Sequence, residues 1–211
     1  MVFRKDVPSF IKVVLAGVAA GSLCALLDLI PADNIWTFSS FSGSLGFWAV
    51  TGMLILMQSE KRLLAGVNVF LYFAFMNAAF FFVHLALPFE FPRIATLEEA
   101  VGQSLVWLIP SFACGLCALI AWEAHRDDLR GTIALSLPCG LLLSESVSLY
   151  LSVFCNHKYL FQAIVDTIGL ILLVLLYRKE KRGVLLAAFV AAVAALILIV
   201  KLALYHNILY Y

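Results

Sequence analysis

Long apolar segments recur along the whole chain and constrain its fold more than any other feature. About 20 apolar residues of α-helix are needed to cross a bilayer core of roughly 30 Å. Only 13% of the 211 residues are charged, whereas soluble domains carry about 25%. The sequence therefore predicts an all-α polytopic membrane helix bundle, a single domain over residues 1–211. Its seven predicted transmembrane helices are residues 9–30, 42–58, 63–87, 101–122, 129–154, 159–177 and 183–205.

The distribution of lysine and arginine predicts the orientation, because short cytoplasmic loops are enriched in both. With seven crossings, most of these residues fall on or near one side, including the run RKEKR at residues 178–182. The N-terminus is therefore predicted to be cytoplasmic and the C-terminus external. The second segment is short enough to be re-entrant, but both termini would then share a side and the charge bias would be lost. We expect a multi-pass protein of a bacterial inner or plasma membrane.

The fifth predicted helix carries a carboxylate, Glu145, near its middle. A charge in the hydrocarbon core costs several kcal/mol, so such groups face a bundle interior and are usually paired, functional or both. At helical spacing Pro138, Ser148 and Ser152 lie on the same face as Glu145. This face is a polar stripe on an otherwise apolar helix.

Two further ionisable residues, Asp166 and Lys201, lie in the last two predicted helices. Measured from the outer helix ends, Glu145 lies about 13 Å deep, Asp166 about 10 Å and Lys201 about 6 Å. Gln162 shares a helix face with Asp166. The residues Glu145, Asp166, Gln162, Lys201 and Ser148 are therefore predicted to line an outward-facing polar pocket.

Two interpretations of this pocket remain open. In the first, the chain is a permease or binding protein, and the carboxylates bind a small polar solute, a cation or a proton. In the second, a buried ion pair fixes the register of the helices while Lys201 extends toward the interface. Asp28 and His84, near outer helix ends, extend the pocket in one reading and face interfacial water in the other.

Enzyme signatures are missing from the sequence. It contains no HExxH, no GxSxG and no Walker loop. A membrane enzyme with Glu145 or Asp166 as general base is therefore the lowest-ranked hypothesis. Four scattered histidines make a metal cluster improbable. We expect no cofactor, and the net charge of +1 argues against nucleic acid as a partner.

Small residues form rows on the first and last predicted helices. Gly17, Gly21 and Ala25 on the first, and alanines between residues 187 and 195 on the last, permit close approach of another helix. These rows either pack within the chain or bind a partner. The alternative function is therefore a non-catalytic accessory or immunity-type protein that acts through a membrane protein partner or as a homo-oligomer.

Local signals mark two helix starts and one cysteine pair. Thr96 and Glu99 form a capping-box pattern, so the fourth helix is predicted to begin at Thr96. The serine-rich residues 39–44 precede the second helix, where they cap it or hold an anion. Cys114 and Cys117 form a CxxC inside an apolar helix, where a redox role is disfavoured.

Three stretches resemble a family of small bacterial integral membrane proteins of unknown function. They are SFSGSLGFWAVTGMLILMQSEKRLLAGVNVFLYF, CGLCALIAWEAHRDDLRGTIALSLPCGLLLSESVSLY and the basic turn RKEKR. Gly140 and Glu145 form the most specific motif, Gly-x-x-x-x-Glu. The chain is also loosely similar to the substrate-capture subunits of energy-coupling transporters, from which it differs by its seventh predicted helix. Both resemblances imply a membrane helix bundle.

Overall fold

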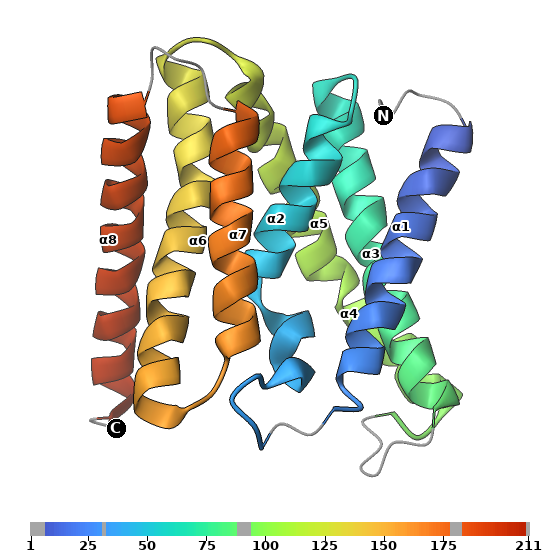
Figure 1. Ribbon diagram of the computed structural model, residues 1–211. Helices are drawn as coiled ribbons and strands as arrows, with labels where there is room; N and C mark the ends of the chain where they lie inside the picture. Colours follow the sequence, from blue (N-terminus) through green and yellow to red (C-terminus); the bar gives the residue numbers. More distant parts are fainter. Residues whose placement is uncertain (1–6, 31–32, 88–93, 178–182, 210–211) are drawn as a thin grey trace. The chain divides into compact units, whose positions relative to one another are not determined.

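The computed structural model describes residues 7–30, 33–87, 94–177 and 183–209, and the regular elements within them are all helices (Figure 1). Six helical stretches are long and apolar enough to cross a membrane. Large apolar side chains such as Phe154, which is 77% exposed, lie on the outside. The chain is thus a multi-pass membrane helix bundle. Its helices are α1 (Val7–Leu27), η1 (Phe38–Gly43), α2 (Leu45–Met57), α3 (Arg62–Ala86), α4 (Leu97–Val106), α5 (Leu108–Ala121), η2 (Trp122–His125), α6 (Leu129–Asn156), α7 (Leu160–Tyr177) and α8 (Gly183–Leu209).

The second predicted transmembrane helix is shorter than expected. The helix α2 has 13 residues, which give about 20 Å at 1.5 Å per residue, and the bilayer core is roughly 30 Å. Residues before it form the 3-10 helix η1 instead of extending α2. Six crossings therefore follow from helix length, and the seventh crossing and the orientation stay predictions. The basic residues at 4–5 and 178–182, which support the orientation, lie outside the described residues.

The fourth predicted transmembrane helix begins as expected but is divided in two. Thr96 caps α4, and its side chain and that of Glu99 form the predicted capping box. The chain leaves regular helix at Trp107, between α4 and α5. Pro110 explains this break, because a proline has no N–H to donate and its ring clashes with the carbonyl four residues earlier, here that of Val106. Residues 97–125 nevertheless form one stretch that is long and apolar enough to cross a membrane, so the prediction of a single crossing here holds, with an interruption at Trp107 that was not predicted.

The chain divides into two compact units. Unit 1 comprises Met1–Gly43 and Thr51–Trp122, and unit 2 comprises Ser44–Val50 and Glu123–Tyr211. A single domain over residues 1–211 stays a prediction.

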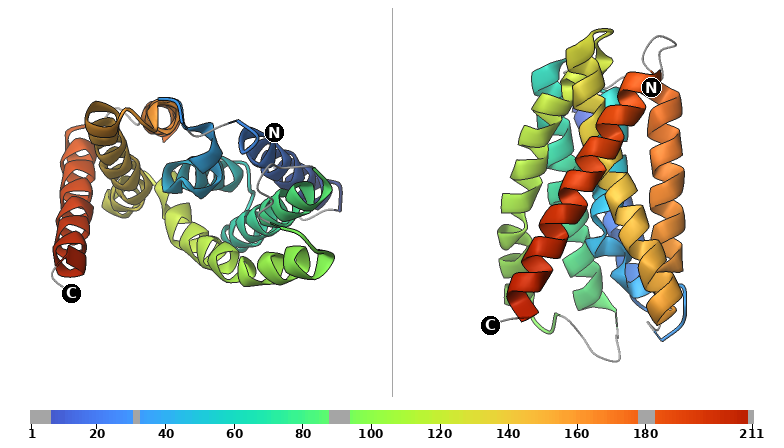
Figure 2. Two further views of the ribbon diagram at one scale, coloured as in Figure 1. Left: turned by 90° about the horizontal axis from the view of Figure 1, so that it is seen from below. Right: turned by 90° about the vertical axis from the view of Figure 1, so that its left-hand side faces the viewer.

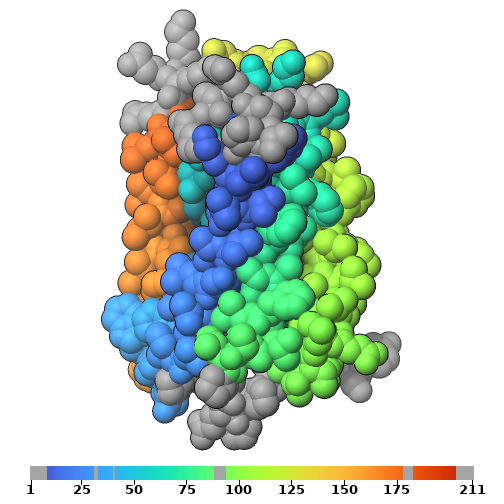
Figure 3. Space-filling view, turned by 90° about the vertical axis from the view of Figure 1, so that its right-hand side faces the viewer, coloured from blue at the N-terminus to red at the C-terminus, as the bar shows by residue number. Residues whose placement is uncertain are grey.

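In unit 1, α3 packs against both α1 and α5, and Figure 3 shows α1 lying along α3. A Cβ atom at Gly17 or Gly21 would collide with the backbone of Tyr72 or Met76 in α3. The small residues of the first helix therefore pack within the chain.

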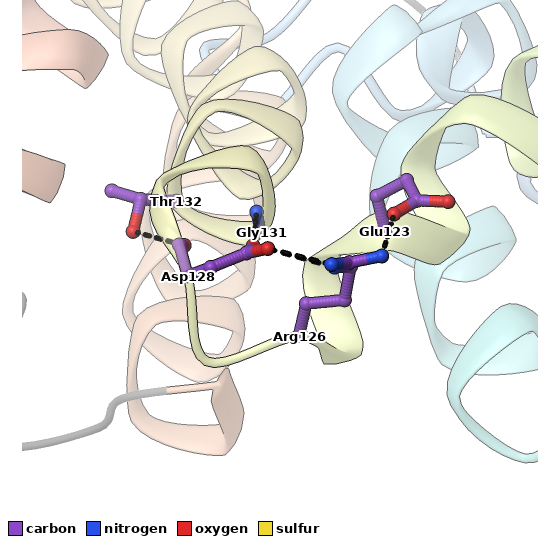
Figure 4. A network of polar contacts seen from close by, with 5 residues as sticks. All are labelled: Glu123, Arg126, Asp128, Gly131 and Thr132. Carbon is purple, nitrogen blue, oxygen red and sulfur yellow. Dashed lines mark hydrogen bonds and ion pairs between the residues drawn. The ribbon is translucent and has the colours of Figure 1, made fainter.

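In unit 2, α6 lies between α7 and α8 (Figures 1 and 2). Asp128 caps α6, and its carboxylate accepts a hydrogen bond from the N–H of Gly131 at 3.0 Å. Arg126 contacts the same carboxylate at 2.8 Å and also Glu123 at 3.5 Å (Figure 4). The Gly131 hydrogen bond first, and then Arg126, hold the pKa of Asp128 below its usual range. This cap fixes the start of the helix that carries Glu145.

We predict that Gly21→Ala lowers the stability of the protein. The added methyl group would force α1 away from the Met76 backbone, and overpacking of this kind costs about 1–3 kcal/mol. Gly102→Ala is the matched control, because Gly102 is an exposed glycine in α4 with open space around it. Thermal unfolding in detergent measures both variants. Equal melting temperatures for Gly21→Ala and wild type would contradict the close packing of α1 on α3.

Candidate functional site

An ion pair joins α6 to α8. The Lys201 Nζ donates a hydrogen bond to Glu145 Oε2 at 2.5 Å, and Ser148 Oγ lies 3.4 Å from the same nitrogen. The side chain of Glu145 is 18% exposed and that of Lys201 is 39% exposed. Glu145 and Ser148 are one helical turn apart, so both reach the same lysine. The structure therefore brings three of the five predicted pocket residues into direct contact.

Asp166 lies on α7 and is completely buried. Its carboxylate lies against Gly46 in the first turn of α2, where a Cβ atom would overlap the carboxylate oxygens. Only glycine at position 46 therefore allows this approach. Within the described residues, neither carboxylate oxygen of Asp166 has a hydrogen-bond partner. The residue that meets this carboxylate is thus Gly46, and the predicted role of the serine-rich residues 39–44 as a cap or an anion site stays a prediction.

The electrostatic surroundings of Asp166 do not fully balance its charge. The first turn of a helix favours a nearby negative charge by about 0.3–1 kcal/mol, and up to about 2 kcal/mol in partly buried geometry. Removing an ionised carboxylate from water costs several kcal/mol. Glu145 and Lys201 both lie within electrostatic range of Asp166, with opposite effects on its charge. With both carboxylates ionised, these three groups carry a net charge of −1.

Neutral polar groups surround this charged cluster on α6 and α7. Gln162, one helical turn before Asp166, is buried and lies on the same helix face. The hydroxyl groups of Tyr150 and Thr167 are 3.2 Å apart and connect α6 to α7 beside Asp166. Side-chain oxygens of this kind are hard ligands that suit protons, alkali cations or polar solutes. With both carboxylates ionised, the site thus combines one excess negative charge with several neutral dipoles.

Several other polar residues make contacts that could not be predicted from the sequence alone. Ser152, on the predicted polar face of α6, accepts a hydrogen bond from Asn156 at 3.3 Å and not from Lys201. Asp28 and His84 contact each other in unit 1, and their side chains are buried. The reading in which they face interfacial water was therefore wrong, and the reading in which they extend the pocket stays a prediction. Asn77 of α3 donates to Ser111 of α5 at 3.1 Å, a helix-to-helix hydrogen bond of the predicted type.

The described residues were compared with the predictions about metal ligands and the CxxC motif. No group of three or more His, Cys, Asp or Glu side chains in that part of the chain is placed to hold a metal ion. The five cysteines at positions 24, 114, 117, 139 and 155 are all described, and each is a free thiol. Cys114 and Cys117 of the CxxC motif are therefore not bonded to each other.

Comparisons with protein families, curated proteins and solved structures gave no match to this chain. Any functional conclusion must therefore rest on the geometry of the site and on the membrane helices.

We predict energetic coupling between Glu145 and Lys201. Glu145→Gln and Lys201→Met should each destabilise the protein, because each leaves one charge without its partner. The double variant should lose less free energy of unfolding than the two single variants lose together. Contacting residues show coupling energies of about 0.5–3 kcal/mol, and we expect a value in the lower part of this range because Lys201 is partly exposed.

The free energy of unfolding is measured in mixed detergent micelles for the wild type, the two single variants and the double variant. Ser152→Ala combined with Lys201→Met is the matched control, and we expect additive effects because Ser152 is hydrogen-bonded elsewhere on α6. Additive losses for Glu145→Gln and Lys201→Met would contradict a stabilising ion pair.

Proposed function

We propose that this chain is a permease or solute-binding protein of a bacterial inner or plasma membrane. In this proposal it crosses the bilayer seven times, with a cytoplasmic N-terminus and an external C-terminus. The distribution of lysine and arginine between the loops supports this orientation. The segment η1 and α2 together has 20 residues between 38 and 57, which is about the length that one crossing requires.

The ligand is a cation or a small polar solute with a cationic group. The observation that carries this proposal is Asp166, a fully buried carboxylate whose oxygens have no hydrogen-bond partner within the described residues. Lys201 is already engaged by Glu145, so a single lysine serves two carboxylates. A bound cation would supply the missing positive charge and the missing oxygen contacts at once.

Each residue of the site has a distinct role in this proposal. Asp166 provides the charge that binds the ligand. Glu145 and Lys201 form a pair that can open, which would let Glu145 approach the ligand while Lys201 extends toward water. Gln162 and Ser148 contribute neutral dipoles that select for a desolvated ligand. Gly46 keeps the space beside Asp166 free of a side chain.

A second candidate function is that of an accessory protein which binds a membrane partner through α8. One observation favours it: five of the six alanines between residues 187 and 195 are exposed, and Ala194 alone among them is buried. Exposed small residues allow another helix to approach closely within a membrane. The partner would be another membrane protein or a second copy of this chain.

We predict that a cation or a cationic solute stabilises the purified protein and that Asp166→Asn abolishes this effect. A ligand at a hundredfold excess over its Kd stabilises the folded state by about 2.7 kcal/mol, which for a chain of this size is a shift of several degrees in Tm. The shift in Tm is measured in detergent by a thermal-shift screen with Li⁺, Na⁺, K⁺, small amines and steps of pH. Glu145→Gln is tested in parallel.

The control variant is Glu60→Gln, which removes an exposed carboxylate between α2 and α3. N-methylglucamine chloride controls for ionic strength. Equal stabilisation of Asp166→Asn and wild type would contradict the assigned site. A screen in which no compound stabilises the wild type would contradict the binding function and leave the α8 surface as the functional feature.

A further inference from the structure

A cavity lies between the last three helices of unit 2. Its volume is about 430 Å³, within the range of about 300–1,000 Å³ that is common for ligand sites. Both α7 and α8 pack on α6, whereas these two helices make little direct contact with each other among the described residues. The residues that line the cavity lie between positions 132 and 143 on α6, 170 and 177 on α7, and 183 and 190 on α8.

The wall of this cavity offers little to a polar ligand. Its side chains are aliphatic except for those of Thr132 and Tyr177. The Thr132 hydroxyl donates a hydrogen bond to the backbone oxygen of Asp128 at 3.3 Å. The hydroxyl oxygen of Tyr177 is buried, so the aromatic ring is the part of this residue that faces the cavity. An ordered water needs two to four polar partners, and the cavity therefore suits hydrocarbon better than water or a charged solute.

The cavity also has the length and direction of an acyl chain in one leaflet. The eleven-residue step from Thr132 to Leu143 rises about 16 Å along α6, which is half of a bilayer core of roughly 30 Å. One end lies where α7 ends at Tyr177 and α8 begins at Gly183, and Figure 1 shows both helix ends on the same side as the start of α6. The other end lies at Leu143, in the middle of α6.

We propose that this cavity binds one acyl chain of a membrane phospholipid, which lies along α6 between α7 and α8. The cavity is partly open to the outside, so a chain can enter it from the bilayer. An empty space would leave its apolar wall without dispersion contacts, and water would find no polar partners there. The site contains described residues only, and the basic run at residues 178–182 is no part of it.

A bound acyl chain would have a structural consequence for α8. It would contact α7 and α8 at once and replace the direct packing that these two helices lack. The site is separate from the proposed ligand site, because Glu145, Asp166 and Lys201 do not line the cavity. Lipid binding here therefore goes beyond the proposed function and does not depend on it.

The test is photochemical labelling of the full chain in lipid nanodiscs. The probe is phosphatidylglycerol with a diazirine partway along one acyl chain, and mass spectrometry locates the labelled residues. We expect label on Leu135 and Leu186, which line the cavity and are only 4% and 7% exposed. Leu175 of α7 is 61% exposed and does not line the cavity, so its label reports ordinary contact with the bilayer.

A matched pair of variants tests whether the chain occupies this cavity. Ala187 lines the cavity, whereas its neighbour Ala188 does not, and both alanines are exposed. Ala187→Trp places a large ring in the cavity and should lower the labelling of Leu135 and Leu186 several-fold. Ala188→Trp should label both leucines as the wild type does, and the label on Leu175 should be the same in all three proteins.

Either of two results would overturn the proposal. The first is a wild type that is labelled at Leu175 but not at Leu135 or Leu186, as expected if a second copy of the chain covers the cavity. The second is unchanged labelling of both leucines in Ala187→Trp, because the chain would then reach them from elsewhere. The wild-type pattern decides the first point even if a variant fails to fold. Neither result depends on cation binding at Asp166, so the two proposals fail separately.

Discussion

An ionised carboxylate loses several kcal/mol when it leaves water for an apolar helical bundle, and among the described residues Asp28, Glu145 and Asp166 place carboxyl groups there. Each has a different counter-group in the structure. Asp28 faces His84, Glu145 binds Lys201, and Asp166 lies against the first turn of α2. Lys201 supplies Glu145 with a full positive charge, whereas an imidazole supplies one to Asp28 only when both of its ring nitrogens carry protons. Asp166 has only the partial charge of a helix terminus beside it, so in its ionised form it is the carboxylate whose charge is least balanced.

The free-energy cost of removing a carboxylate from water also explains why close helix packing matters for function. Gly46 lets the backbone of α2 reach the carboxylate of Asp166, and a larger residue would separate them. Gly21 lets α1 lie directly on the backbone of α3. In a bilayer, helices gain little from apolar contact alone, so close packing and polar contacts provide most of their association. Small residues therefore set the distances at which the charged groups meet.

Much of the fold could be predicted from the sequence, because apolar length and capping signals are local. The starts of α4 and α6 are encoded by Thr96 with Glu99 and by Asp128. The break at Trp107 was also readable, since Pro110 lies three residues later. The contacts of the site were harder. Nothing local to Gly46 indicates that it faces Asp166, and nothing local to Asp28 indicates His84, because both contacts depend on how distant helices pack. Helical spacing and depth placed Glu145, Asp166 and Lys201 in one region, but not their partners.

The most direct test of the unbalanced charge at Asp166 is charge displacement in proteoliposomes on a solid-supported membrane. The protein is exposed to a sudden rise in Na⁺, K⁺ or H⁺ concentration, with N-methylglucamine as the replaced cation. The account predicts a transient current for at least one of these cations in wild type and in Glu60→Gln, and none in Asp166→Asn. Equal currents in Asp166→Asn, or no current in the wild type for any of the three, would contradict it.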